Sequence, residues 1–126
     1  MATYKATELS TGVKKVSFNN TTGSGTCEIN NAFGSSRIGS WRLQVVPGGA
    51  APGSLVLKTR LSGSGLSGSN WLTPIYYSDA TTTTANAGDA ITTVGIFTVI
   101  CDRCDLMLDW TTGADGMDVY LAPVMG

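Results

Sequence analysis

The sequence predicts an all-β protein, an antiparallel β-sandwich of jelly-roll type with about eight strands. Residues 94–121 contain three segments in which apolar and polar side chains alternate, which is typical of strands buried on one face. Shorter alternating segments precede them and are separated by clusters rich in Gly, Pro, Ser and Asn. No segment combines a long helical periodicity with helix caps.

The three C-terminal strands are predicted at residues 96–101, 104–110 and 118–121. Residues 111–116 separate the last two and carry two glycines and an aspartate, which favour a turn. Because side chains alternate between the faces of a strand, the apolar positions should share one core. With two positions from earlier strands, the predicted core is Phe97, Val99, Leu106, Leu108, Trp110, Val119, Leu43 and Leu57.

Five shorter strands are predicted before this stretch. They cover residues 13–18, 26–29, 40–46, 54–61 and 70–78. The last of them contains Pro74, which cannot donate to a ladder, so it is expected to be an edge or bulged strand. The segments between the strands are predicted to be turns or surface loops, at residues 19–25, 30–39, 47–53, 62–69 and 79–89.

The chain of 126 residues is long enough for one domain with its own core. A boundary at residues 62–69 would leave halves of roughly 60 residues, each marginal for an independent core. Residues 13–126 are therefore predicted to form a single sandwich domain. Residues 1–12 are predicted to be an N-terminal arm, with Tyr4 and Leu9 among polar residues. The arm is expected to be mobile when free and to pair with a sheet edge of a neighbouring molecule.

Composition narrows the classes of partner. Charged residues make up 13% of the chain, against about 25% in typical soluble proteins. A surface of Thr, Ser, Asn and Gly suits a protein packed against others, although an ordinary sandwich with a polar surface accounts for it equally well. The net charge is −1 and Lys14–Lys15 is the only adjacent basic pair, so nucleic-acid binding is not predicted. No membrane span and no signal peptide are predicted either, and synthesis in a cytoplasm is expected.

The motif Cys101-x-x-Cys104 could belong to a metal or redox site. The chain has no His and only one further cysteine, Cys27, so a four-ligand zinc site is not predicted. A redox pair would need a helix that lowers the thiol pKa, which the pattern does not provide. Both cysteines are instead expected to pack as small apolar side chains, with reduced thiols. If their strands pair as a hairpin, the two would lie near disulfide distance.

No catalytic, cofactor-binding or metal-binding residue is predicted, and the protein is not expected to be an enzyme. The aspartates of residues 102–118 do not follow the ligand spacing of a calcium loop. The absence of His removes a Ser- or Cys-based triad, and there is no phosphate-binding loop. Nothing in the pattern marks a pair of carboxylates facing a cleft, as a glycosidase needs.

The aromatic residues suggest a binding surface. Trp41 and Trp110 fall on the apolar faces of their strands and are expected in the core. Trp71 follows the glycine-rich loop and precedes Tyr76 and Tyr77. These three rings are predicted to be partly exposed, where they could contact another protein or stack on a sugar.

Residues 95–121 have the sequence G-I-F-T-V-I-C-D-R-C-D-L-M-L-D-W-T-T-G-A-D-G-M-D-V-Y-L. This segment resembles the closing strands of β-sandwich proteins built into tailed-phage particles. The resemblance covers about the last third of the chain and contains no catalytic signature. It implies a virion structural protein of the capsid decoration or cement type, made in the host cytoplasm. Its implied partners are copies of itself, as a trimer, and a major capsid or other virion protein. The alternative is a carbohydrate-binding sandwich module of a tail or fibre.

Overall fold

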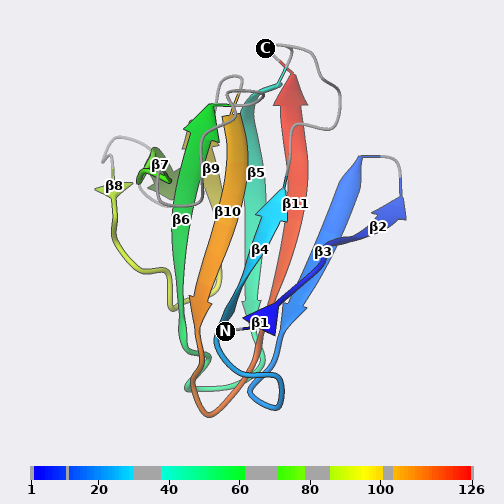
Figure 1. Ribbon diagram of the computed structural model, residues 1–126, viewed down its shortest axis with the longest axis vertical. Coiled ribbons are helices and arrows are strands. Elements are labelled where there is room, and N and C mark those ends of the chain that lie inside the picture. The colour runs from blue at the N-terminus through cyan, green and yellow to red at the C-terminus, as the bar shows by residue number, and fades with distance from the viewer. Residues whose placement is uncertain are drawn as a thin grey trace.

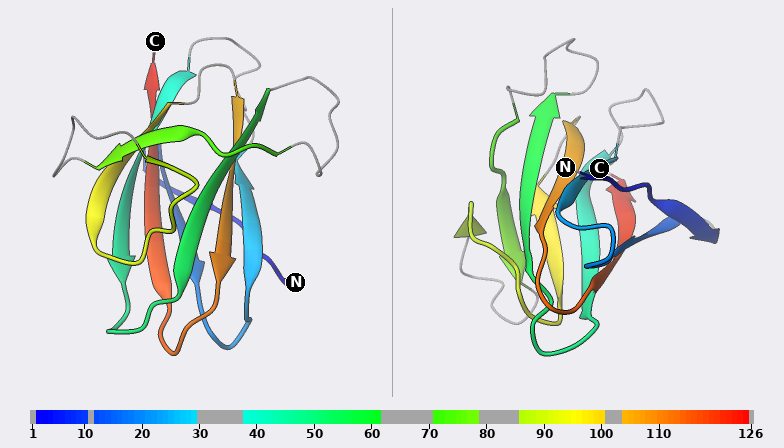
Figure 2. Two further views of the ribbon diagram at one scale, coloured as in Figure 1. Left: turned by 90° about the vertical axis from the view of Figure 1, so that its left-hand side faces the viewer. Right: turned by 60° about the horizontal axis from the view of Figure 1, so that its bottom comes forward.

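Two β-sheets packed face to face make up the computed structural model, which describes residues 2–10, 12–29, 38–61, 71–78, 86–100 and 104–125 (Figures 1 and 2). The four-stranded sheet has the order β1 (Ala2–Thr3), β4 (Gly25–Ile29), β10 (Cys104–Thr111) and β6 (Ser54–Leu61). The seven-stranded sheet has the order β2 (Thr7–Ser10), β3 (Val13–Phe18), β11 (Met117–Met125), β5 (Ile38–Pro47), β9 (Gly95–Ile100), β7 (Ile75–Ser78) and β8 (Asn86–Ala87). The predicted all-β sandwich is confirmed. The described residues include no helix that could cross a membrane.

Neighbouring strands in the sheets are mostly distant in sequence. All pairs are antiparallel except β1 with β4, which is parallel. From β3 to β7, each strand lies in the opposite sheet from the one before it, and β9, β10 and β11 alternate in the same way. The last strand, β11, consequently lies between β3 and β5, where Val119 is opposite both Val16 and Val45. The fold therefore depends on long-range contacts, which the apolar rows of the strands stabilise.

The eight strands predicted from alternation correspond to β3–β7 and β9–β11. Strand β6 has the predicted bounds, whereas β5 begins at Ile38, within a predicted loop. Strand β7 begins only after Pro74, as expected for a residue that cannot donate to a ladder. Strands β1, β2 and β8 are short and were not predicted. The predicted loop 62–69 and most of loop 79–89 lie outside the described residues.

The N-terminal segment lies within the sandwich, in place of the separate arm that the sequence predicts. Strand β1 runs beside β4, and the backbone N–H of Tyr4 donates to the carbonyl of Thr26 at 2.8 Å. The chain then crosses to the other sheet, where β2 pairs with β3 (Figure 1). Tyr4 is 8% exposed, so this one aromatic ring and the backbone pairing hold a segment of low apolar content. Leu9, on the edge strand β2, is 53% exposed.

The core lies between the sheets and contains every residue predicted for it. At one end, Tyr4, Phe18 and Trp110 form an aromatic cluster. The rings of Phe18 and Trp110 stack with centroids 5.4 Å apart, and Tyr4 meets Phe18 edge-on at 4.8 Å. Trp41 is also buried as predicted, and its Nε1 has no hydrogen-bond partner among the described residues. Aromatic contacts of this kind add to the stabilisation that comes from burial alone.

Three loops are joined at the end of the sandwich near this cluster. The loop after β5 exchanges hydrogen bonds with the loop after β10: Asp115 N–H donates to the Ala51 carbonyl at 2.8 Å, and its carboxylate accepts from Ala51 N–H at 3.0 Å. The loop after β3 joins them through Asn20, whose Nδ2 donates to the carbonyl of Ala114 at 2.7 Å. Gly53 adopts a φ of +79°, and a Cβ there would lie 2.2 Å from the carbonyl oxygen of Thr111. The loops at this end thus hold one another in place.

Leu108→Ala tests the core assignment. Leu108 has 0% exposure and lies in the middle of β10, so its truncation leaves a cavity between the sheets. The free energy of unfolding should fall by about 2–5 kcal/mol. Urea unfolding of both proteins measures this difference, and an unchanged midpoint would mean that the face of β10 is wrongly assigned.

Tyr4→Ala tests whether the N-terminal segment is part of the core. The substitution removes a buried ring from the aromatic cluster and should lower the free energy of unfolding by about 3–5 kcal/mol. Leu9→Ala is the matched control, because Leu9 lies in the same segment but is exposed, and it should change stability by less than about 0.5 kcal/mol. Equal stability of the two variants would show that residues 2–10 are a detachable arm.

Candidate interaction surfaces

The predicted aromatic surface at Tyr76 and Tyr77 is divided between the two faces of β7. Tyr76 points inward, is 4% exposed and meets Phe97 edge-on with ring centroids 6.0 Å apart. Its hydroxyl donates to the carbonyl of Asp89 at 3.0 Å, and burial raises its pKa, with a smaller contribution from the charge of Asp89. Tyr77 faces outward, half-buried, opposite Thr98 of β9. Tyr76 is therefore a core residue, and only Tyr77 remains available for contact.

Trp71 lies beside the edge of the other sheet. The neighbouring Leu72 exchanges backbone hydrogen bonds with Thr59 of β6, which holds this segment against the four-stranded sheet. The ring of Trp71 is half-buried, and the guanidinium carbon of Arg60 lies 4.2 Å from its centroid. This cation–π contact occupies one face of the ring. Trp71, Tyr76 and Tyr77 consequently do not form one flat aromatic patch.

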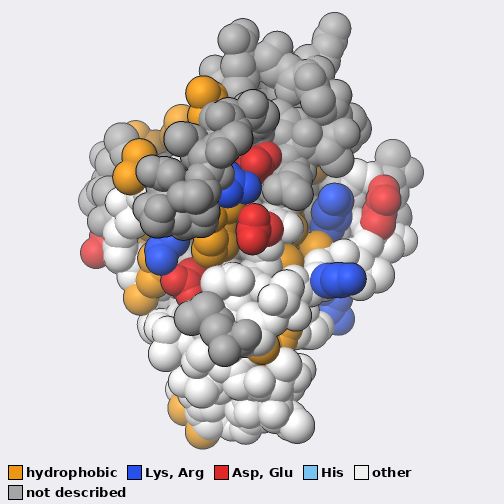
Figure 3. Space-filling view, in the orientation of Figure 1, with side chains coloured by type: hydrophobic (Ala, Val, Ile, Leu, Met, Phe, Trp, Pro, Cys, Tyr) orange, Lys and Arg blue, Asp and Glu red, His pale blue; other side chains and the backbone are white. Residues whose placement is uncertain are grey.

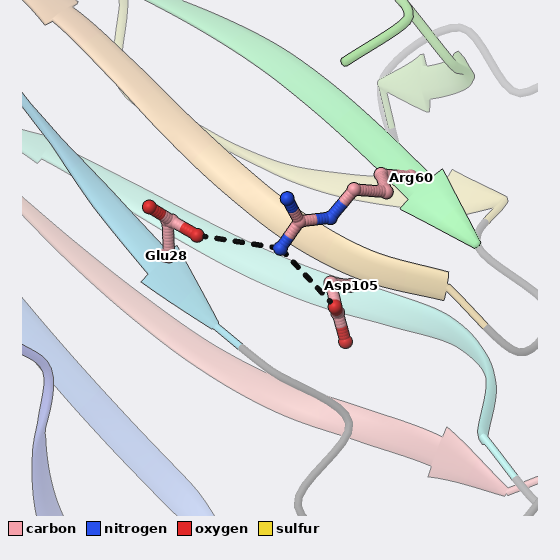
Figure 4. Close-up of polar contacts among 3 residues, drawn as sticks. All are labelled: Glu28, Arg60 and Asp105. Carbon is pink, nitrogen blue, oxygen red and sulfur yellow. Dashed lines mark ion pairs between the residues drawn. The ribbon is translucent and has the colours of Figure 1, made fainter. Parts of the chain in front are cut away.

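Arg60 is the centre of a charged network on the outer face of the four-stranded sheet (Figure 4). It is directly opposite Asp105 of β10, and its Nη2 lies 3.6 Å from a carboxylate oxygen of that residue. The same Nη2 lies 3.6 Å from Glu28 of β4, on the far side of β10. Side chains on one face of neighbouring strands come within reach of each other directly and diagonally, which explains this three-strand contact. The Arg60 side chain is only 17% exposed.

A second ion pair continues the same surface. Lys58 Nζ lies 2.9 Å from the carboxylate of Asp109, and both side chains are more exposed than those of Arg60 and Asp105. Met107 lies between these pairs on the outer face of β10 and is 9% exposed. Figure 3 views this side of the molecule and shows side chains of both charges interleaved over the sheet. The face is thus rich in charge, and its described charges are paired with one another.

The outer face of the seven-stranded sheet has the opposite character. Its outward residues include an aliphatic set of four whose exposure is between 37% and 50%. We call this surface the aliphatic face, defined by Val46 of β5, Ile96 and Ile100 of β9 and Val124 of β11. Lys15 lies toward one side of it, 3.8 Å from Asp118 and 5.4 Å from the ring centroid of Tyr120. They form two pairs at opposite ends of the strands, Val46 with Ile96 and Ile100 with Val124, and each pair offers apolar surface to a partner protein.

A shallow hollow of about 220 Å³ lies in the middle of this face. Side chains of four neighbouring strands surround it, including Val13, Arg42, Gln44, Ile96 and Tyr120. Its walls are mostly apolar, with polar groups at a few positions. The hollow has room for a few side chains of another protein and is smaller than the usual pocket for a drug-sized ligand.

The packing role predicted for Cys101 and Cys104 can be followed only for Cys104. Cys104 opens β10, half-buried, and packs against the core cluster. Cys27 is 1% exposed, and burial raises the pKa of its thiol to about 11, so it stays protonated near neutral pH. Cys101 lies outside the described residues. Among the described residues, no group of three or more His, Cys, Asp or Glu side chains is placed to hold a metal ion.

Sequence reasoning missed the charged network, although it placed Arg60 and Asp105 on the polar sides of their strands. Alternation assigns a residue to a face but does not say which strands are neighbours.

Comparison of the chain with protein-family models, curated proteins and solved structures gives no significant match.

Arg60→Met tests the energetic importance of the network, because it keeps an apolar stem and removes the charge opposite buried Asp105. The free energy of unfolding of Arg60→Met should be about 1–3 kcal/mol lower than that of the wild type, a loss between those typical of exposed and buried ion pairs. Lys58→Met is the matched control on the same strand, since its more exposed pair should contribute less than about 1 kcal/mol. In the double variant Arg60→Met/Asp105→Asn, part of the loss should be recovered. Equal losses for Arg60→Met and Lys58→Met would contradict this ranking.

Proposed function

We propose that the protein is a non-enzymatic structural subunit of a tailed-phage virion, of the capsid decoration or cement type. It would act by binding copies of itself and a major capsid or other virion protein, and would be located in the virion after synthesis in the host cytoplasm. The resemblance of residues 95–121 to closing strands of such proteins supports the class. The proposal requires no catalytic residue, cofactor or metal.

The aliphatic face is the observation that carries this proposal. A folded chain with 13% charged residues has exposed Val46, Ile96, Ile100 and Val124 on one sheet face, while the charges of the other sheet face pair with each other. Covering such a face against another protein removes apolar surface from water, and two of its charged residues, Lys15 and Asp118, already pair with each other. This favours a contact protein over one whose face stays in solvent.

The frame of the molecule also suits a structural role. The joined loops at one end give a surface held by hydrogen bonds, and β2 has a neighbour on only one side among the strands that the structure describes. In this proposal β2 pairs with a strand of a neighbouring subunit, as predicted for the N-terminal segment, while that segment stays bound to its own sandwich. Several weak contacts of this kind, repeated on a lattice, give high avidity.

The jelly-roll interpretation is supported by the alternation of consecutive strands between the sheets, which is how Greek-key connections build a two-sheet structure. A trimer is implied only by the resemblance.

The alternative function, carbohydrate binding, relied on Trp71, Tyr76 and Tyr77 as a stacking platform. Because Tyr76 is buried and Trp71 is stacked on Arg60, no specific observation favours it.

The proposed function predicts that the protein is an abundant component of purified virions. Quantitative peptide mass spectrometry of particles from the encoding phage should find it in many copies, in a fixed ratio to the major capsid protein. Particles stripped of it should bind the purified protein again to the same ratio in co-sedimentation, while unrelated particles of similar size should not. Absence from purified virions would contradict the proposal.

A further inference from the structure

The first residues of the chain are hydrogen-bonded to the loop between β3 and β4. The hydroxyl of Tyr4 lies within hydrogen-bond distance of two carbonyl oxygens of this loop, those of Asn19 and Gly23, and its single proton is shared between them. The backbone N–H of Ala2 donates to a third carbonyl, that of Ser24, at 2.9 Å. Within the loop, Gly23 N–H donates back to the carbonyl of Asn19 at 3.1 Å. One short segment therefore contacts both ends of this loop.

The β3–β4 loop, residues 19–24, is joined in turn to the loop after β10. The Oγ of Ser24 accepts a hydrogen bond from Thr112 N–H at 2.9 Å. At the other end of the β3–β4 loop, Asn20 Nδ2 donates to the carbonyl of Ala114 at 2.7 Å. The β3–β4 loop thus lies between the N-terminal segment and the loop after β10, and it is bonded to both.

Residues 2–6 are themselves attached to the sandwich by few interactions. Strand β1 pairs with β4 over two residues, and Tyr4 is the one large apolar side chain of this segment. A hollow of about 460 Å³ lies beside the segment and is lined in part by Thr3, Lys5 and Ala6. Segments with few buried contacts can open locally while the rest of a protein stays folded. We therefore expect residues 2–6 to detach more often than the whole sandwich unfolds.

From these contacts we infer that residues 2–4 are a latch for the loop end of the sandwich. When the latch is docked, it holds the β3–β4 loop and, through that loop, the loop after β10. When it is released, both loops open more often. Capture of residues 2–4 by another chain, or their removal, therefore changes the surface that the two loops present. The inference goes beyond the proposed function and does not depend on it, because its test uses the isolated chain.

Tyr4→Phe tests the latch, because it keeps the buried ring and removes only the hydroxyl. Native-state amide hydrogen exchange of the full chain, followed by NMR, measures how often each loop opens. The amides of Gly23 and Thr112 should both exchange at least about five-fold faster than in the wild type. The matched control is Tyr76→Phe, which removes a tyrosine hydroxyl that is bonded to the carbonyl of Asp89 at the β7 side of the sandwich. It should leave both rates within about two-fold of the wild type.

Each outcome decides the inference. Unchanged exchange at Gly23 and Thr112, or faster exchange at only one of them, would overturn the latch, since release would then not pass from one loop to the other. Equal acceleration in Tyr76→Phe would also overturn it, because the effect would be a general loss of stability. If Tyr4→Phe fails to fold, Ala2→Pro removes the N–H that donates to the β3–β4 loop and should accelerate the same two amides. The proposed function is decided separately, by the presence of the protein in virions.

Discussion

The burial of Trp110 is the constraint on which much of this structure depends. Its ring stacks on Phe18 and is met edge-on by Tyr4, so one side chain of β10 holds the seven-stranded sheet and the N-terminal segment. Its indole N–H donates to the carbonyl of Pro52 at 3.0 Å, which also fixes the loop after β5. An unsatisfied donor in the interior is costly, so this hydrogen bond stabilises the buried ring of Trp110. The joined loop end and the aromatic end of the core are thus one structural unit.

The same strand also explains why the two outer faces differ. The inward row of β10 fills the core, while its outward row carries Asp105, Met107 and Asp109. These acids lie opposite Arg60 and near Lys58 of β6, so the charges of the four-stranded sheet are largely neutralised within it. On the opposite side of the sandwich, the described outward rows of β3, β5, β9 and β11 carry three charged residues, Lys15, Arg42 and Asp118, and also expose aliphatic groups. The two outer faces therefore differ: the described charges of one pair with each other, and the other exposes the four aliphatic side chains of the aliphatic face.

Under the proposed function, stability and assembly would depend on different parts of the fold. The core and the joined loops give rigidity without any contribution from the aliphatic face, whose residues are partly exposed in the single chain. Replacing one of them should alter association far more than folding. A rigid subunit with weak contact surfaces is suited to a lattice, because little conformational entropy is lost when it binds.

The sequence by itself determined eight of the eleven described strands, their inward faces and much of the core, because the side-chain direction in a strand depends only on the alternation of neighbouring residues. It assigned Leu108 and Val119 to the interior, and it also placed Arg60 and Asp105 on outward faces. Only the tertiary structure decided that Arg60 meets Asp105 and Glu28, that Trp71 stacks on Arg60, and that Tyr4 and Tyr76 belong to the core. Each of these depends on which strands become neighbours across long connections, and in this sandwich consecutive strands mostly lie in different sheets. The alternation of side chains carries no information about which strands become neighbours, because strand order is decided by the packing of both sheets together.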